Sequence, residues 1–177
     1  MSRWSAGIAA AAILLLAVTA HPARADDPCA GFKWNVERER ALFAGTAASA
    51  AAARDAAGGA QLQPDVLYEL TLAPQQQVSL SVPAGNKSTF DGAFAGFARL
   101  QVPTAGVYRV SLSRPGWIDL IGEHGAIASS DFSGQHGCNA PHKVVQFQLP
   151  AGSLVLQLTG VDGPRVTVTL TRAPASP

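Results

Sequence analysis

The chain of 177 residues has little charge of either sign. Charged residues make up 14% of the sequence, and the formal net charge is +1. A balance this close to neutral provides no electrostatic attraction to nucleic acid or to an anionic lipid surface. We therefore expect no nucleic-acid partner.

Long apolar runs are also scarce, and the one prominent run, residues 8–18, is eleven residues long. This is too short for a stable membrane span. Arg3 precedes the run and the small-x-small sequence of residues 23–25 follows it, an order typical of a secretory signal peptide. We predict that residues 1–25 are removed. The mature chain, without a stable membrane span, would then be periplasmic or secreted.

The chain has only two cysteines, Cys29 and Cys138. In an exported chain, two cysteines without a third most simply pair with each other. The bridge would close a loop of about 109 residues, for which the chain-entropy model gives roughly 4–5 kcal/mol as an upper figure. The alternative is a zinc site of Cys138 with His136 and His142, whose residue types suit that metal. Their spacing matches none of the strong paired zinc motifs.

Enzyme motifs are missing as well. The sequence has no G-x-S-x-G nucleophile motif and no H-x-H pair of the kind found in cupin-type iron sites. His124, His136 and a carboxylate such as Glu123 or Asp131 form a metal-binding set only if the fold brings them together. A metal-dependent enzyme using His124, His136 and His142 is therefore an alternative, and we predict no cofactor.

What the chain does have is a change in the spacing of its apolar residues at residue 65. Residues 29–45 are typical of a short amphipathic helix, and the alanine-rich residues 46–64 indicate a marginal helix or mobile linker. After residue 65, alternating apolar residues predict strands. They form eight segments: 65–72, 77–82, 94–102, 107–113, 117–122, 144–149, 154–158 and 165–170. We predict a linker region over 26–64 and an antiparallel β-sandwich or jelly roll of about eight strands over 65–177.

Three residues are candidates for ligand contact on this sheet. Phe97 points outward by alternation, and Trp117 follows a Pro-Gly turn into a strand that is apolar on both faces. Asp119 lies on the same strand, where burial would raise the pKa of its carboxyl. Exposed aromatic residues on a sandwich are typical of a carbohydrate-binding module, which is a further alternative. No second carboxylate stands at a defined spacing from Asp119, so glycosidase chemistry is not supported.

Three stretches carry a resemblance: "CAGFKWNVERERALF", "AGVYRVSLSRPGWIDLI", and "CNAPHKVVQFQL" with the following "LVLQLTG". Through them the chain resembles a group of small exported proteins from Gram-negative bacteria, some labelled homogentisate 1,2-dioxygenase. The resemblance implies that Cys29 and Cys138 are the group's cysteine pair and that residues 117–119 are its "WID" strand. The sheet region is similar in pattern to pre-peptidase C-terminal domains.

These observations together predict a non-catalytic exported protein. Its partner would be an unidentified envelope protein or a small ligand. A metal-dependent enzyme of dioxygenase type and a carbohydrate-binding module are the alternatives.

Overall fold

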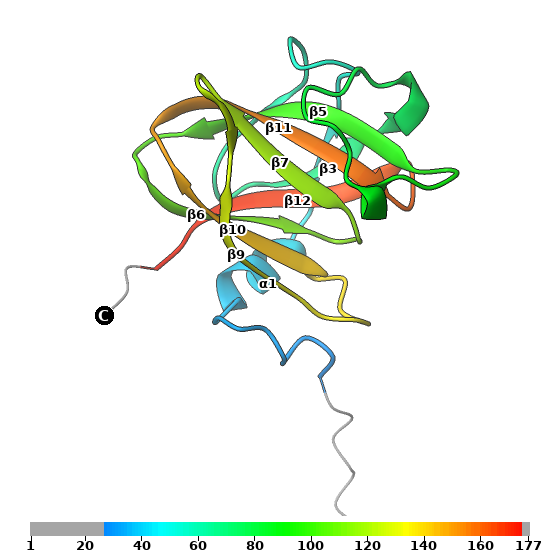
Figure 1. Cartoon of the computed structure of the whole chain (residues 1–177). Coiled ribbons are helices and arrows are strands. Elements are labelled where there is room, and N and C mark those ends of the chain that lie inside the picture. The colour runs from blue at the N-terminus through cyan, green and yellow to red at the C-terminus, as the bar shows by residue number, and fades with distance from the viewer. Residues whose placement is uncertain (1–26, 175–177) are drawn as a thin grey trace, which may run out of the picture.

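The structure is a computed structural model that describes residues 27–174, so the predicted signal peptide of residues 1–25 lies outside the described residues. Within this part the chain forms two sheets of six strands and one short α-helix (Figure 1). The elements are α1 (Glu37–Phe43), β1 (Ala48–Ala51), β2 (Gln61–Leu62), β3 (Leu67–Thr71), β4 (Ala73–Pro74), β5 (Phe94–Val102), β6 (Gly106–Leu112), β7 (Trp117–Gly122), β8 (Gly125–Ile127), β9 (Ser129–Gly134), β10 (Lys143–Leu149), β11 (Gly152–Val161) and β12 (Arg165–Arg172).

The two sheets pack as a β-sandwich, which confirms the predicted all-β fold class. Sheet A has the strand order β1-β3-β12-β6-β10-β9. Sheet B has the order β2-β5-β11-β7-β8, and β4 also pairs with β5. The core lies between the sheets and follows the predicted alternation of side chains.

Alternation places one face of each long strand in this core. On β6, Tyr108, Val110 and Leu112 are at most 1% exposed. The other long strands contribute in the same way: Ala98, Leu100, Val102, Val145, Phe147, Leu149, Leu154, Leu156, Leu158, Val166, Val168 and Leu170. Each fully buried large apolar side chain contributes roughly 1.5–3 kcal/mol. A register slip by one residue would expose a whole set, so burial fixes the register.

The prediction of about eight antiparallel strands is wrong in number and in pairing. The described residues contain twelve strands, and two pairs, β1 with β3 and β2 with β5, are parallel. Five strands were not predicted: β1, β2, β4, β8 and β9. They have two to six residues and few large apolar side chains, so they carry little periodic signal.

The alanine-rich residues 46–64 are neither helix nor linker, since they add strands to both sheets. β1 pairs with β3, Ala53 forms a bridge with Phe97, and β2 pairs with β5. Small side chains permit this close approach. A Cβ atom on Gly59, whose φ is +104°, would lie 2.6 Å from the carbonyl oxygen of Phe97. A Cβ on Gly96 would lie 2.6 Å from the Cβ of Ala52. Alanine and glycine therefore serve backbone contact here.

Residues 75–93 cross the outer face of sheet B, where a strand at 77–82 was predicted. Gln157 of β11 holds this crossing. Its Oε1 accepts hydrogen bonds from the backbone nitrogens of Ser81 and Val82 at 2.8 and 3.1 Å, and its Nε2 donates to the carbonyl of Val82 at 2.8 Å. The backbone of Ser81 and Val82 is thus bonded to one side-chain amide instead of to a neighbouring strand, and residues 77–82 do not form the predicted strand.

Phe97 lies beside this anchor, directly opposite Gln157 in the register of β5 and β11. It points away from the core as predicted, but it is fully buried. The crossing segment that Gln157 holds lies over this face of the sheet. The prediction that Phe97 is an exposed contact residue is therefore wrong.

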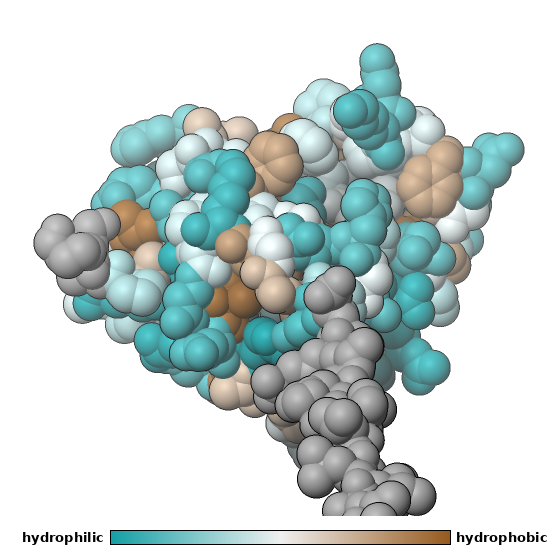
Figure 2. All heavy atoms as spheres, turned by 90° about the horizontal axis from the view of Figure 1, so that it is seen from below, coloured by the Kyte–Doolittle hydropathy of each residue, from teal (hydrophilic) through white to brown (hydrophobic). Residues whose placement is uncertain are grey.

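Residues 27–43 cross the outer face of sheet A on the opposite side of the molecule. The predicted helix over 29–45 shortens to the seven residues of α1. Glu39 is buried; it accepts a hydrogen bond from Thr171 Oγ1 at 2.6 Å and lies 3.8 Å from Arg109 Nη1. Seen from the side of α1, the surface is largely hydrophilic, with apolar residues in small separate areas (Figure 2). No helix within residues 27–174 is long and apolar enough to cross a membrane.

Candidate functional site

An apolar pocket of about 150 Å³ opens where β7 of sheet B lies against β9 and β10 of sheet A. It is lined by Trp117, Ile118, Ser129, Phe132, Lys143 and Val145. Two of these, Trp117 and Phe132, are among the few large apolar side chains that the described residues leave exposed, at 49% and 61%. Residues 117–118, 129–132 and 143–145 are far apart in sequence, so the fold assembles the site.

Trp117 is the first residue of β7 and follows the Pro115-Gly116 turn. Ile118 and Leu120 point into the core, which turns Trp117 and Asp119 outward. The indole Nε1 donates a hydrogen bond of 3.0 Å to Asp119 Oδ1. This bond fixes the orientation of the exposed ring.

Asp119 is the second predicted contact residue, and its role in the structure is to position Trp117. Its other oxygen, Oδ2, accepts a hydrogen bond from Gln157 Nε2 at 3.2 Å. Desolvation by burial raises the pKa of the Asp119 carboxyl, while the bonds from Trp117 and Gln157 oppose this increase. Both oxygens are therefore engaged, as expected for an aspartate that holds its neighbours.

Lys143 begins β10 and reaches from sheet A to sheet B. Its Nζ donates to the carbonyl oxygen of Gly116 at 2.8 Å and lies 5.2 Å from the centre of the Trp117 ring. Burial lowers the pKa of Lys143, and the nearby Asp119 charge partly restores it. The ammonium group thus forms a polar wall in a mostly apolar pocket, which Ser129 also lines.

Phe132 forms the other aromatic wall, on the edge strand β9. It lies opposite Val145 of β10, so it belongs to the inner face of sheet A, yet its side chain remains exposed. Lys33 Nζ lies 5.5 Å from the ring centre and forms an ion pair of 2.7 Å with Asp131. This ion pair lowers the pKa of Asp131.

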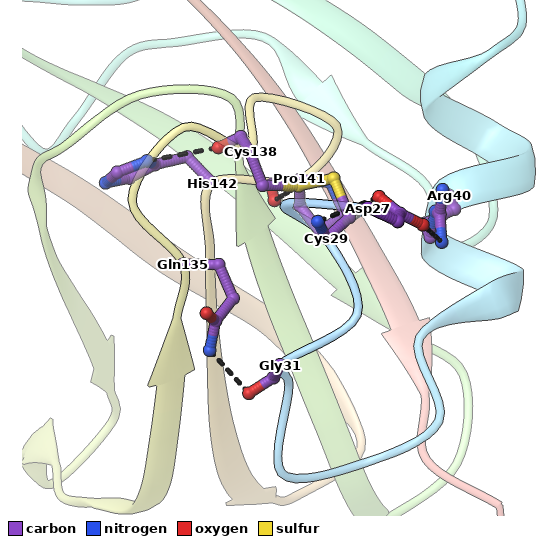
Figure 3. Close-up of a disulfide and its surroundings, with 8 residues drawn as sticks. All are labelled: Asp27, Cys29, Gly31, Arg40, Gln135, Cys138, Pro141 and His142. Atoms are coloured by element: carbon purple, nitrogen blue, oxygen red, sulfur yellow. Dashed lines mark hydrogen bonds and ion pairs between the residues drawn. A yellow bond between two sulfur atoms is a disulfide. The ribbon is translucent and has the colours of Figure 1, made fainter. Parts of the chain in front are cut away.

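The predicted disulfide between Cys29 and Cys138 is present, with Cα atoms 5.1 Å apart (Figure 3). It attaches the start of the N-terminal segment to the loop before β10. Gln135 Nε2 donates to the carbonyl of Gly31 beside it. The carbonyl oxygen of Pro141 lies 2.8 Å from Cys138 Sγ. Since a disulfide sulfur carries no proton, this is a contact and not a hydrogen bond.

The three candidate metal-binding histidines do not come together. His136 and His142 are neighbours, with ring centres 6.3 Å apart, and Nδ1 of His142 lies 3.1 Å from the carbonyl of Cys138. His124 lies in the turn between β7 and β8, beside a different hollow. Nowhere in residues 27–174 do three histidine, cysteine, aspartate or glutamate side chains form a group that could hold a metal ion. The Cys138 sulfur is also removed as a ligand by the disulfide.

Sequence reasoning identified Trp117 and Asp119 but missed Phe132 and Lys143. Phe132 is the only apolar side chain in "SSDFSG", so alternation predicts no strand there. Lys143 directly precedes residues 144–149, where the alternating apolar residues predict a strand. A separate hollow, lined in part by His136 and His142, shares the lining residues Phe132 and Lys143 with the aromatic pocket. The histidine-containing loop therefore borders the aromatic pocket.

Compared with known proteins, the chain matches no protein-family model and no curated protein. The resemblance to small exported proteins remains a prediction. The fold and the site define an all-β sandwich that carries a disulfide and an aromatic pocket between its sheets.

Proposed function

We propose that the chain is an exported, non-catalytic binding protein that receives an apolar side chain of a partner protein in the pocket of Trp117, Phe132 and Lys143. The observation that carries this proposal is the pair of exposed aromatic rings lining one apolar hollow. Large aromatic side chains around a pocket dominate the energy of many protein interfaces. Two such rings exposed at one hollow offer a partner apolar surface whose burial stabilises a complex.

The size and lining of the hollow favour one apolar group as the occupant. A volume of about 150 Å³ is close to that of a cavity known to accept a single benzene ring. Ile118 and Val145 form its apolar floor, and Ser129 and Lys143 supply the polar groups. An aromatic or aliphatic side chain fits this composition, because its burial requires no hydrogen bonds.

The site is also held in place before any partner arrives. Gln157 bonds to Asp119, Asp119 bonds to Trp117, and Lys143 lies over the indole ring. Little side-chain freedom remains to be lost on binding, which increases affinity for a given contact area.

Export is supported by the disulfide and by the sequence before it. Disulfides persist in oxidising compartments and are rare in the cytosol. The predicted signal peptide of residues 1–25 directs such a chain out of the cytoplasm. We propose a periplasmic or secreted location, with an envelope protein as the partner.

A saccharide is the second candidate occupant. The exposed face of Trp117 stands beside the Asp119 carboxylate, and a stacked sugar needs both an aromatic surface and hydrogen-bonding groups. The metal-dependent dioxygenase alternative has no comparable support, because the three histidines are not grouped.

NMR titration of the ¹⁵N-labelled mature chain tests the proposal. The probes are N-acetyl-phenylalaninamide and N-acetyl-leucinamide for a partner side chain, and methyl glucoside for a saccharide. We expect a saturable shift of the Trp117 indole N–H signal with the amides. W117A has no indole N–H at this position, so the backbone N–H signal of Lys143 is followed instead, and its saturable shift should be lost. F132A should weaken binding by at least about fivefold.

Phe90→Ala is the matched control, because Phe90 is 46% exposed and does not line the pocket. It should bind as the wild type does. Saturation by the glucoside alone would favour the saccharide. No saturable shift with any probe, or equal binding by F132A and F90A, would contradict the assigned site.

A further inference from the structure

A separate hollow, of about 560 Å³, lies on the outer face of sheet A, where the N-terminal segment crosses β6 and β10 near the end of β12. It is lined by Trp34, Val107, Arg109, Gln146, Arg172, Ala173 and Pro174. It shares no lining residue with the aromatic pocket of Trp117. Its chemistry is also different, because two guanidinium groups face it.

Arg109 is the centre of this hollow, and its side chain is only 7% exposed. Its Nε donates to Gln146 Oε1 at 3.3 Å, and its Nη1 donates to the carbonyl of Asn35 at 3.0 Å. The guanidinium carbon lies 4.9 Å from the centre of the Trp34 ring. Within residues 27–174 these bonds leave Nη2 without a partner. A buried guanidinium is therefore fixed in place with one of its donor groups unused.

The remaining polar groups of the hollow are donors too. The Nε–H of Arg109 can only donate, so Gln146 must present Oε1 to it, and the amide NH₂ of Gln146 stays available. Arg172, the last residue of β12, adds an exposed guanidinium. Among the described residues, no carboxylate lines the hollow.

The local charge is positive even with Glu39 included. Glu39 lies behind Arg109, where it accepts the bond from Thr171, and it balances one of the two guanidinium groups. The second guanidinium charge is not balanced by a carboxylate among the described residues that line the hollow. Trp34 and Val107 provide an apolar wall beside the donors.

We propose that this hollow binds an anionic group, a carboxylate or a phosphate, carried on an apolar body. Arg109 and Arg172 bind the anion, Gln146 donates a further hydrogen bond, and Trp34 contacts the apolar part. Guanidinium groups suit this role because their planar donors match the oxygens of carboxylate and phosphate. This site is independent of the aromatic pocket and of the partner proposed for it.

Isothermal titration calorimetry of the mature chain tests the site, with sodium benzoate as the carboxylate probe and inorganic phosphate as the phosphate probe. Ionic strength is held constant, because added salt alone screens charges. We expect saturable binding of at least one probe with a dissociation constant of about 1 mM or lower. Preference for benzoate would identify a carboxylate on an apolar body as the ligand group, and preference for phosphate would identify a phosphate group.

Arg172→Ala should weaken that binding by about tenfold, since it removes one of two charge-assisted contacts. Arg165→Ala is the matched control: Arg165 is the first residue of the same strand, it is exposed, and it does not line the hollow. R165A should bind within about twofold of the wild type. R109K keeps the charge of Arg109 but loses the planar fork, and it should weaken binding as well.

Two results would overturn the proposal. The first is the absence of saturable binding of both probes to the wild type. The second is equal weakening by R165A and R172A, which would show attraction to the general surface charge only. If R109K does not fold, the comparison of R172A with R165A still decides the question.

Discussion

The ammonium nitrogen of Lys143 lies 5.2 Å from the centre of the Trp117 ring, although the two residues belong to different sheets. The same nitrogen donates to the carbonyl of Gly116, one residue before Trp117. The side chain of Lys143 therefore ties the start of β10 to the start of β7 and holds the indole at the mouth of the pocket. A cation–π contact of this kind contributes about 0.5–1 kcal/mol at partly exposed sites.

Replacing Lys143 with methionine should change how stability depends on pH. Burial lowers the pKa of Lys143 in the folded chain below its ordinary value of 10.5. Between the folded and the ordinary value the unfolded chain binds more protons, so the free energy of unfolding contributed by Lys143 rises with pH. Urea unfolding of wild type and K143M across this alkaline range should show their difference shifting in favour of the wild type. A difference that falls with pH would contradict the desolvation of Lys143.

Opening the disulfide should destabilise the fold strongly. Cys29 and Cys138 are 109 positions apart, and a closed loop of this length contributes about 4 kcal/mol by restricting the unfolded chain. We expect reduced wild type and the C29S/C138S double variant to unfold at similar, clearly lower urea concentrations. An unchanged midpoint would show that the N-terminal segment needs no covalent attachment.

Removing Glu39 should leave Arg109 as an uncompensated buried charge. Breaking one partner of a buried ion pair costs about 3–5 kcal/mol, so E39A should lower the free energy of unfolding by about that amount. E39Q keeps an acceptor for Thr171 Oγ1 and should lose less. Glu37→Ala is the control on the same helix, because Glu37 is exposed, and it should change stability by less than about 0.5 kcal/mol. Equal effects of E39A and E37A would show that the buried contacts of Glu39 do not stabilise the fold.

Replacing Gln157 with alanine should release the segment that crosses sheet B. The change leaves the backbone amides of Ser81 and Val82 without their acceptor, which costs about 1–3 kcal/mol for each amide that finds no water. Limited proteolysis with mass spectrometry should then detect new cleavage near these residues. Gln148→Ala, an exposed glutamine on β10, should leave the cleavage pattern unchanged. Resistance of Q157A to cleavage would show that other contacts hold the segment.

The sequence predicts the sandwich well, because the apolar residues of each long strand alternate and point into the core between the sheets. Alternation at "VYRVSLS" or "RVTVTL" reflects the apolar face that such a strand turns toward the core, and it needs no knowledge of the partner strand. The disulfide was also predictable from two cysteines in a chain that its first 25 residues predict to be exported. By contrast, alternation shows which side of β5 Phe97 faces and says nothing about what covers that side.

The aromatic pocket could not be predicted from local sequence patterns, because its residues come from three separate strands. Lys143 and Trp117 meet across two sheets, and Phe132 joins them from an edge strand with no periodic signal. The alanine-rich segment was misinterpreted for a related reason. Helix propensity describes an isolated segment, whereas the edges of β3 and β5 offer it backbone hydrogen bonds and leave room only for small side chains.

The contacts of the N-terminal segment set an order of events during synthesis. Lys33 contacts Ser133, one hundred positions later, and Glu39 contacts Thr171, 132 positions later. The residues made first therefore reach their final place only after the last strand exists. A chain that ends before β12 therefore lacks the contact between Glu39 and Thr171, and its N-terminal segment cannot yet be held in its final position on sheet A.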